Sequence, residues 1–301
     1  MTGIPVTFPG VKALDGVDLC LYPGEVHALM GENGAGKSTL IKALTGVNTL
    51  TAGRIEVDGK EVSFSGPAQA QAGGVAVVFQ EVNLCANLSV AENVMLGHEP
   101  TSGPFISWRS MRRQAKEHLA RLHLDIDPAS SLGSHTIATQ QLCAIARALV
   151  VDAKVLVLDE PTSSLDKDEV AELFAVVREL KAAGVAILFV SHFLDQVYEI
   201  SDRMTVLRNG RLVGTAATAD LPAGEVTVGE STIVDLLVST GLEKGRNAAR
   251  KTVAGGGAYL NNVKVVDEDA PVVAEQLLAG GVVLVRKGRR NLAVARQAQQ
   301  H

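Results

Sequence analysis

The stretch MGENGAGKST, residues 30–39, places three glycines, a lysine and two hydroxyl side chains within ten positions. Gly31, Gly36, Lys37 and Ser38 fit the pattern G-x-x-x-x-G-K-[ST], in which backbone N–H groups turn inward around a polyphosphate. The lysine then reaches the terminal phosphates, and the serine hydroxyl can bind Mg²⁺. Asn33, Gly34, Ala35 and Thr39 complete the predicted loop. The stretch therefore predicts a binding site for ATP with Mg²⁺.

Two carboxylates end the apolar run VLVLDE at residues 155–160. A buried charge needs a metal ion or a proton to compensate it. Asp159 suits a water-mediated contact with Mg²⁺, and Glu160 suits the base that polarises an attacking water. A strand that ends in Asp-Glu is unremarkable alone, but together with a phosphate loop it predicts a nucleotide hydrolase.

Gln80 and His192 each follow an apolar run that reads as a core strand. Such residues are more often structural than functional when they are judged without their neighbours. The carboxyl ends of parallel strands, however, form the edge at which open α/β sheets bind ligands. We therefore expect Gln80 to reach Mg²⁺ and the attacking water, and His192 to contact the γ-phosphate.

Strand and helix patterns alternate around these residues. Strands are predicted at 26–30, 75–79, 155–158 and 185–190, helices at 38–44, 166–183 and 193–200, and hairpins that turn at Asp58-Gly59 and Asn209-Gly210. Strand signals fade between about 83 and 150, where helical spacing predominates. The pattern predicts an α/β P-loop NTPase with a mixed-sheet core, an antiparallel β subdomain and a helical subdomain.

Composition narrows the class of protein. A hydrophobic fraction of 47% and a net charge of -5 are typical of a globular protein and argue against a nucleic-acid partner recognised through general basicity. The three cysteines are far apart and lack metal-ligand spacing, which favours reduced thiols in a cytosolic compartment. No apolar run approaches the length of a membrane span, so any membrane role is expected to be peripheral.

The stretch RSMRRQAKEHLAR at 109–121 is rich in arginine and lysine. Its basic residues are Arg109, Arg112, Arg113, Lys116 and Arg121. A solvated helix face is the simpler interpretation. Contact with a membrane subunit or with lipid headgroups is the alternative.

The order of these motifs resembles that of the ATP-binding-cassette ATPases, over residues 8 to 240. Within that family, TFPGVKALDGVDL, FQEVNLCANLSVAENVMLG and HFLDQVYEISDRMTVLRNGRLVG resemble the first cassette of monosaccharide importers of the ribose, xylose and galactofuranose type. The galactofuranose importer ATPases look closest. The resemblance implies the fold of an ABC ATPase nucleotide-binding domain.

The resemblance also implies roles for further residues. Phe8 would stack on adenine, Gln80 would link the nucleotide to the membrane subunit, and Ser164, Leu165 and Asp166 would lie at the seam of a dimer. The strand before Phe8 is short and contains Pro5, which is unfavourable for the adenine platform.

The family's signature, usually Leu-Ser-x-Gly-Gln, is replaced here by residues 135–139, HTIAT, followed by Gln140. Thr136 keeps the hydroxyl, and the helix that follows would still face a γ-phosphate. Ala138 adds a methyl group where a phosphate is expected to approach closely. We therefore expect a weakened signature.

The resemblance implies an ATP-hydrolysing motor at the cytoplasmic face of the cell membrane, coupled to sugar uptake. Its partners would be transmembrane permease subunits, a second ATPase cassette from a homodimer or a separate chain, and indirectly a periplasmic sugar-binding protein. Two alternatives are a soluble cassette in DNA repair or translation and a nucleotide-binding cassette with impaired hydrolysis. Only 56 positions separate Gln80 from Thr136, too few for the long coiled coil of repair ATPases.

The tail is the least defined part of the sequence. We predict an ATPase domain over 1–240 and a linker and tail over 241–301, where GLEKGRNAARKTVAGGG is rich in glycine and charge. LLAGGVVLV at 277–285 matches LYPGEVHAL at 21–29 in three of nine positions. The tail is thus either a vestige of a second cassette or similar to one by chance.

Overall fold

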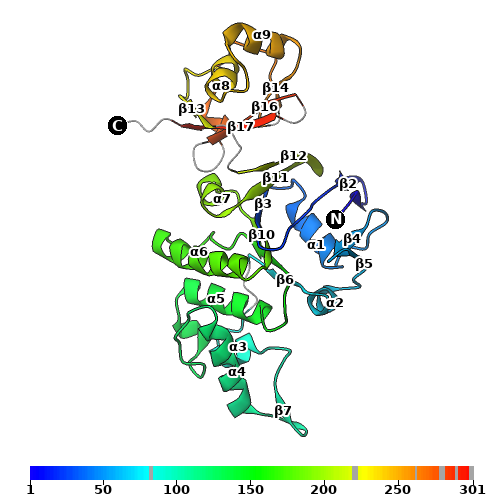
Figure 1. Cartoon of the computed structure of the whole chain (residues 1–301), viewed down its shortest axis with the longest axis vertical. Helices are drawn as coiled ribbons and strands as arrows, with labels where there is room; N and C mark the ends of the chain where they lie inside the picture. The colour runs from blue at the N-terminus through cyan, green and yellow to red at the C-terminus, as the bar shows by residue number, and fades with distance from the viewer. Residues whose placement is uncertain (81–83, 219–222, 262, 278–281, 289–290, 298–301) are drawn as a thin grey trace.

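The structure is a computed structural model that describes residues 1–80, 84–218, 223–261, 263–277, 282–288 and 291–297. Residue 83, at the expected start of the helical subdomain, lies outside the described residues. Figure 1 shows a helical part at one end, a central sheet with its helices, and a C-terminal part at the other end. Among the described residues, no helix combines the length and the apolar character needed to cross a bilayer.

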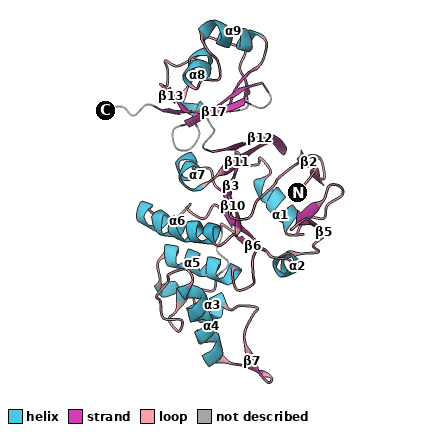
Figure 2. Ribbon diagram, viewed as in Figure 1, coloured by secondary structure: helices cyan, strands magenta, loops and turns pink. Residues whose placement is uncertain are grey.

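A six-stranded sheet forms the centre, in the order β12-β11-β3-β10-β9-β6 (Figure 2). Its strands are β3 (Val26–Met30), β6 (Val75–Val78), β9 (Val155–Asp159), β10 (Ala186–Val190), β11 (Arg203–Arg208) and β12 (Arg211–Ala217). Five of them run parallel, and β12 pairs antiparallel with β11 at the edge. β10 is buried along its whole length, as its uninterrupted apolar run predicts.

Helices cover both faces of this sheet. They are α1 (Lys37–Leu44), α2 (Pro67–Ala72), α6 (Lys167–Ala182) and α7 (Leu194–Ile200). Alternate residues of β10 point to opposite faces: Ile187 and Phe189 join one buried apolar cluster, and Leu188 and Val190 join the other. Phe189 also meets Phe174 of α6 edge-on, with ring centroids 5.9 Å apart.

Antiparallel hairpins flank the α1 side. β1 (Ile4–Phe8) pairs with β2 (Val11–Val17), and β4 (Ile55–Val57) pairs with β5 (Lys60–Val62). Asp58 and Gly59 form the turn of the second hairpin, with φ values of 51° and 69°, as the sequence predicted. β1 forms despite Pro5 because it belongs to a two-stranded sheet, in which an edge position tolerates proline.

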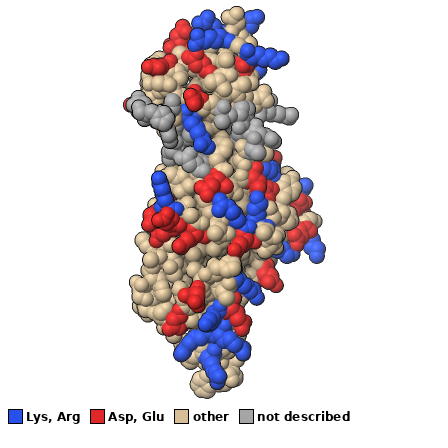
Figure 3. All heavy atoms as spheres, turned by 60° about the vertical axis from the view of Figure 1, so that its left-hand side comes forward, with Lys and Arg blue, Asp and Glu red and all other residues tan. Residues whose placement is uncertain are grey.

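The helical subdomain contains α3 (Val90–Val94), α4 (Trp108–Ala120) and α5 (Ile137–Ala148). It also contains a hairpin of two-residue strands, β7 (Thr101–Ser102) and β8 (Phe105–Ile106), that the sequence did not predict. Strands this short carry no measurable periodicity. The arginine-rich face of α4 is exposed, and Figure 3 shows basic side chains gathered at this end of the molecule.

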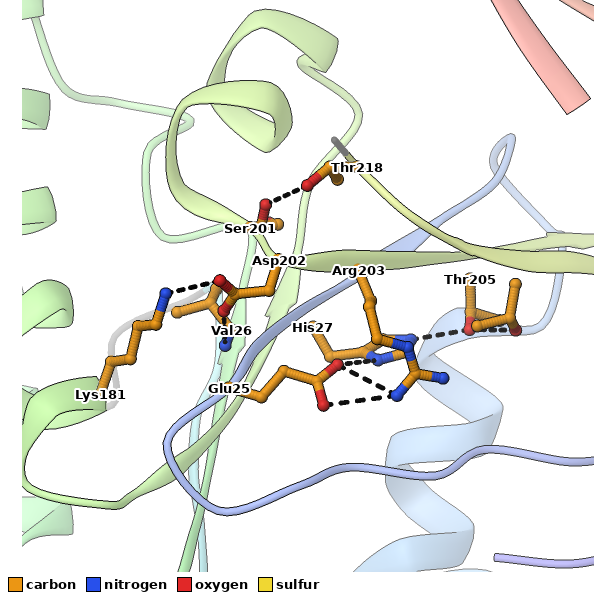
Figure 4. A network of polar contacts seen from close by, with 10 residues as sticks. Glu25, Val26, His27, Lys181, Ser201, Asp202, Arg203, Thr205 and Thr218 are labelled. Carbon is orange, nitrogen blue, oxygen red and sulfur yellow. Dashed lines mark hydrogen bonds and ion pairs between the residues drawn. The ribbon is translucent and has the colours of Figure 1, made fainter. Parts of the chain in front are cut away.

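A buried polar network joins β3 to β11 at the end of the sheet where both strands begin (Figure 4). His27 Nδ1 lies 3.0 Å from Glu25 Oε1, and His27 Nε2 lies 2.7 Å from Thr205 Oγ1. Arg203 donates to both Glu25 carboxylate oxygens at 3.3 Å. Burial lowers the pKa of His27, Glu25 opposes that shift, and the charge of Arg203 adds to it. Sequence analysis gave no indication of this network.

The C-terminal part is a small α/β module rather than a linker. Its elements are β13 (Ala223–Val226), α8 (Ile233–Ser239), α9 (Arg246–Ala254), β14 (Ala258–Leu260), β15 (Val263–Lys264), β16 (Val282–Lys287) and β17 (Asn291–Gln297). The prediction of a linker at 241–257 is wrong for α9, which packs through Ala249 and Val253. Two apolar residues one turn apart were too weak a signal among so many charged neighbours.

The tail also differs from the start of a cassette in its topology. β3 is a parallel strand that leads into the phosphate loop, whereas β16 leads into an antiparallel hairpin with β17. The sheet order in the tail is β13-β17-β16-β14-β15. Part of the 277–285 segment lies outside the described residues, and β16 begins at Val282.

The tail packs directly on the central sheet. Leu284 of β16 and Val294 of β17 belong to the same buried apolar cluster as Met204 of β11. The Arg296 guanidinium lies 5.0 Å from the centroid of the Tyr198 ring on α7. Burial raises the pKa of Tyr198 to about 12. The two parts thus share apolar and polar contacts.

Candidate nucleotide-binding and catalytic site

The predicted phosphate loop lies between the end of β3 and the start of α1. Gly31 has a φ of +154°, and a Cβ there would lie 2.5 Å from the Leu207 carbonyl oxygen. Gly36 has a φ of +104°, and a Cβ there would lie 2.8 Å from Leu14 Cδ2. Glycine is required at both positions because the loop packs closely against its neighbours.

Lys37 folds back over this loop. Its Nζ donates to the carbonyl oxygens of Gly31 at 2.7 Å and Glu32 at 3.3 Å. Burial lowers the pKa of the Lys37 ammonium, while the Glu160 and Asp159 carboxylates oppose that shift. The structure therefore positions one cation beside the loop's backbone N–H groups, which is the arrangement that a polyphosphate needs.

A cavity of about 450 Å³ contains this loop together with Gln80, Asp159 and Glu160. The sequence-predicted residues that line it are Asn33, Gly34, Ala35, Gly36, Lys37, Ser38, Thr39, Gln80, Asp159 and Glu160. They come from the loop that follows β3, from the start of α1, and from the ends of β6 and β9. The topology thus joins residues that are up to 127 positions apart, since parallel strands end at one edge of the sheet.

Asp159 and Glu160 stand at the edge of this cavity in different environments. Asp159 ends β9 beside Val190 of β10. Burial raises the pKa of Asp159, the Glu160 charge adds to the rise, and Lys37 opposes it. Glu160 has a φ of +48°, and its N–H donates to the Val190 carbonyl oxygen at 2.9 Å. A left-handed glutamate is the kind of backbone strain found at functional sites.

His192 reaches the site through Glu160. Its Nδ1 lies 3.4 Å from Glu160 Oε1, and its ring packs against Phe193 with centroids 4.1 Å apart. His192 is not among the described residues that line the cavity. In this structure it contacts the predicted base rather than the space for the phosphates.

The residues predicted to bind Mg²⁺ fit that ion by their chemistry. Ser38, Gln80 and Asp159 offer hydroxyl, amide and carboxylate oxygens to one cavity. Magnesium prefers oxygen ligands and is usually held by one or two carboxylates together with substrate phosphates. No cluster of three or more His, Cys, Asp and Glu residues suited to a metal occurs in the described part of the chain. The oxygen donors of Ser38, Gln80 and Asp159 suit Mg²⁺ that is bound together with phosphates.

Other predicted site residues lie outside this cavity. Phe8 is 44% exposed at the end of β1 and pairs with Val11, which does line the cavity. Ser164 is exposed. Asp166 is the N-cap of α6. Its carboxylate accepts hydrogen bonds from the N–H groups of Asp168 and Glu169, both at 2.9 Å. Leu165 packs against the apolar core.

The signature segment begins α5, and one expectation about it is wrong. Thr136 is the exposed N-cap, and its Oγ1 accepts from the Thr139 N–H at 3.2 Å. Gln140 donates to the His135 carbonyl oxygen at 3.0 Å and so braces the loop. Ala138 is only 3% exposed, so its methyl group faces the core rather than an approaching phosphate. The preceding side chain, Ile137, is 54% exposed.

Sequence analysis missed part of the cavity wall. Lys12, Asn209 and Gly210 also line the cavity. The Gly210 N–H donates to the Ala35 carbonyl oxygen at 3.0 Å, which fastens the β11–β12 turn to the phosphate loop. The Asn-Gly turn was visible in the sequence, but its place against the loop depends on the tertiary fold.

Comparison with known proteins agrees with this geometry. Residues 14–163 match the ABC transporter family. Two crystal structures of an ATP-binding cassette of an ABC transporter, one in its ADP conformation, are 29% and 30% identical, each with a TM-score of 0.65 over 72% of this chain and 89% of theirs. The chain belongs to the ABC transporter ATP-binding family. The predicted fold class and family are therefore confirmed.

Relatives of this cassette carry the names of sugar importers. The fructose import ATP-binding protein of Bifidobacterium longum is 64% identical over 228 residues, which are 75% of this chain and 44% of that protein. The galactofuranose transporter ATP-binding protein of Escherichia coli is 50% identical over 224 residues, 74% of this chain and 45% of that protein. The chain thus spans less than half of the length of these relatives.

The tail matches a different family. Residues 214–295 match the C-terminal domain family described as tyrosine--tRNA ligase SYY-like. This range contains the elements from β13 to β16 and most of β17. The cassette therefore ends in a segment that is similar to a family outside the ABC transporters.

Proposed function

We propose that this chain is the ATP-hydrolysing motor subunit of a monosaccharide importer. The observation that carries the proposal is that one cavity contains the phosphate loop, Gln80, Asp159 and Glu160 together. The names of the relatives at 64% and 50% identity support sugar import over a soluble role in repair or translation. The sequence motifs do not identify the sugar; the fructose importer is the more similar of these two relatives, so we propose a fructose-type sugar.

The residues divide the chemistry between them. Lys37 and the loop N–H groups bind the phosphates, and Ser38, Gln80 and Asp159 would hold Mg²⁺, which supplies positive charge to the phosphate oxygens. Glu160 orients and activates the attacking water. His192, 3.4 Å from Glu160, positions that carboxylate and reaches the γ-phosphate when the site closes. Phe8, next to a cavity residue, would stack on adenine.

The proposed partners follow from the family. A second cassette, in a homodimer or on another chain, would cover the phosphates with its signature segment, and Ser164 would lie at that seam. Transmembrane permease subunits would bind the cassette at the cytoplasmic face of the membrane, with Gln80 linking them to the nucleotide. A periplasmic sugar-binding protein would act indirectly. The alternative of a cassette with impaired hydrolysis rests on the altered signature.

The tail is proposed to be a separate module. Its own buried apolar cluster, its hairpin topology and its match to another family favour this over a vestige of a second cassette. The expectation of no nucleic-acid partner stays a prediction. The tail is where that prediction most needs a test, because the matching family is named for a tRNA ligase.

Glu160→Gln tests the proposed chemistry. The amide keeps the shape of the side chain but cannot act as a base, so we expect hydrolysis about 10² to 10⁴ times slower with MgATP affinity retained. Glu172→Gln, an exposed position on α6, is the matched control and should keep wild-type turnover. Phosphate release and equilibrium ATP binding, measured with and without reconstituted permease, give both readouts. Equal turnover in Glu160→Gln and the control would refute the assignment of Glu160.

A further inference from the structure

A second cavity, of about 710 Å³, lies where the tail meets the cassette. Four cationic side chains line it: Lys12 of β2, Arg208 of β11, Arg211 of β12 and Arg286 of β16. Three belong to the cassette and one to the tail, so the site is complete only when both parts are docked. Its volume is in the range of pockets that bind small ligands.

Basic side chains outnumber acidic ones among the described residues that line this cavity. Asp15 is the one carboxylate among the described residues that line it. It forms ion pairs with both Lys12 and Arg211, at 2.9 Å for Arg211. Like charges gathered around a shared space repel one another unless an anion lies between them. The cavity therefore has an excess of positive charge.

Arg208 and Arg286 are held in place by their own contacts. Arg208 donates from Nη1 to the Asn261 carbonyl oxygen of the tail at 3.0 Å, while its buried Nε has no hydrogen-bond partner in the described part of the chain. The Arg286 guanidinium stacks on the Tyr259 ring, 3.7 Å from the centroid, and donates to the Gly288 carbonyl oxygen. Arginines fixed in this way are preorganised to bind an anion.

We propose that this cavity binds a small phosphate-bearing ligand. Arginine donors match the oxygens of a phosphate group in a forked geometry, and three arginines with a lysine favour a ligand that carries more than one phosphate charge. The residues come from both modules, so the ligand also holds the tail against the cassette. This proposal does not depend on ATP hydrolysis.

The cavity is connected to the nucleotide site by a short path. Lys12 and Asn209 line both cavities. Gly210, next to Asn209, donates to Ala35 of the phosphate loop, and its Cα packs so closely that a Cβ would lie 2.3 Å from the Ala13 carbonyl oxygen. A ligand that shifts this turn therefore shifts the phosphate loop, and the two sites are expected to influence each other's affinity.

Pyrophosphate binding to the full chain tests the proposal. The substitution Lys37→Ala lowers the affinity of the phosphate loop for pyrophosphate. Titration calorimetry on this variant, with a chelator present, then measures pyrophosphate binding at the proposed cavity. We expect one saturable site per chain. Adding Arg211→Gln or Arg286→Gln should weaken it about 10- to 100-fold, the loss typical of one charge-assisted hydrogen bond. Arg109→Gln and Arg250→Gln, which are outside the cavity, are the matched controls and should leave the affinity unchanged.

Two results would overturn the proposal. One is the absence of saturable binding in the Lys37→Ala chain at constant ionic strength. The other is a residual site that the control substitutions weaken as much as Arg211→Gln does, which would indicate general attraction to basic surface. Circular dichroism verifies that each variant is folded, and Arg211→Lys, which keeps the charge, should bind more tightly than Arg211→Gln.

Discussion

Lys37 is the only lysine or arginine among the described loop residues 31–39, and the fold holds it there before any nucleotide arrives. Two carbonyl oxygens bind its ammonium, and two carboxylates nearby favour its charged form. A cation that is already in place need not be ordered when ATP binds. Much of the binding free energy for the phosphates should therefore depend on this one side chain.

Lys37→Ala should accordingly weaken MgATP binding by about 100-fold, the loss expected when strong charge-assisted hydrogen bonds are removed. Lys42→Ala is the matched control, because Lys42 is exposed on the same helix and does not line the cavity. Equilibrium binding of a fluorescent ATP analogue gives both dissociation constants. Similar affinities in the two variants would contradict the phosphate-loop assignment.

His27 gives the fold a pH dependence. Burial lowers its pKa below the ordinary 6.5, so the unfolded chain binds more protons than the folded chain below that pH. This contribution to stability is present above pH 6.5 and is lost as the pH falls toward the folded pKa. We expect wild-type unfolding midpoints in urea to fall more steeply between pH 7 and pH 5 than those of His27→Gln.

The exposed His98 provides the control for that experiment, and His98→Gln should keep the wild-type slope. Identical slopes in His27→Gln and wild type would show that the buried imidazole does not titrate in this range. Glu25 and Arg203 face the ring and act in opposite directions on its pKa, so neither alone is expected to cancel the effect of burial.

At the residue scale, sequence reasoning succeeded where chemistry follows from spacing in the chain. Gly31, Gly36 and Lys37 are close in sequence, and Asp159 and Glu160 are adjacent, so strand-end logic was enough to place them. Lys12 and Asn209 were missed because only the packing of a distant hairpin brings them to the loop. The His27 network was missed because the residue pattern of β3 does not show which polar side chains will form hydrogen bonds with neighbouring strands.

At the scale of elements, the parallel strands and their helices followed the predicted pattern within one or two residues. Long apolar runs and glycine turns provide strong signals. The hairpin β7–β8 and helix α9 were missed for the opposite reason, since two-residue strands and a helix with two buried residues are nearly indistinguishable from loop by pattern. The direction in which the Ala138 methyl group points could be inferred only from its burial in the structure, and a single sequence does not reveal burial.

Asp166 has two assigned roles: it caps helix α6 in the structure, and the sequence resemblance places it at the dimer seam. Asp166→Ala removes the acceptor for two backbone N–H groups, and we expect it to destabilise the chain by about 1 kcal/mol. Asp166→Asn keeps an acceptor oxygen and should lose much less. Urea unfolding of both variants measures the difference. Equal stability of the alanine and asparagine variants would mean that the cap contributes nothing measurable.

At the scale of the whole molecule, the nucleotide cavity is open to solvent. Ser38 and Gln80 are exposed, and none of Thr136, Ile137 and Ala138 is among the described residues that line the cavity. We therefore propose that the start of α5 meets the γ-phosphate bound by another cassette. The tail supplies no second phosphate loop in its described part.

We therefore expect the purified chain to hydrolyse ATP well below about 1 s⁻¹, the low end for working enzymes, with a rate per chain that rises with chain concentration. Replacing residues 135–139 with Leu-Ser-Gly-Gly-Gln should raise turnover by about 10² to 10³, the usual value of one contact to developing charge. Serine keeps the helix cap that Thr136 provides.

Two single variants locate the cause of that gain. Ile137 is 54% exposed and Ala138 is 3% exposed, so Ile137→Gly should reproduce most of the increase and Ala138→Gly little of it. Removing the exposed side chain lets the partner's phosphates approach the N–H groups at the start of α5, whereas the buried methyl group does not obstruct them. Steady-state phosphate release over a range of chain concentrations measures both. If the wild-type chain already turns over several ATP per second at every concentration, the proposed need for a partner cassette is wrong.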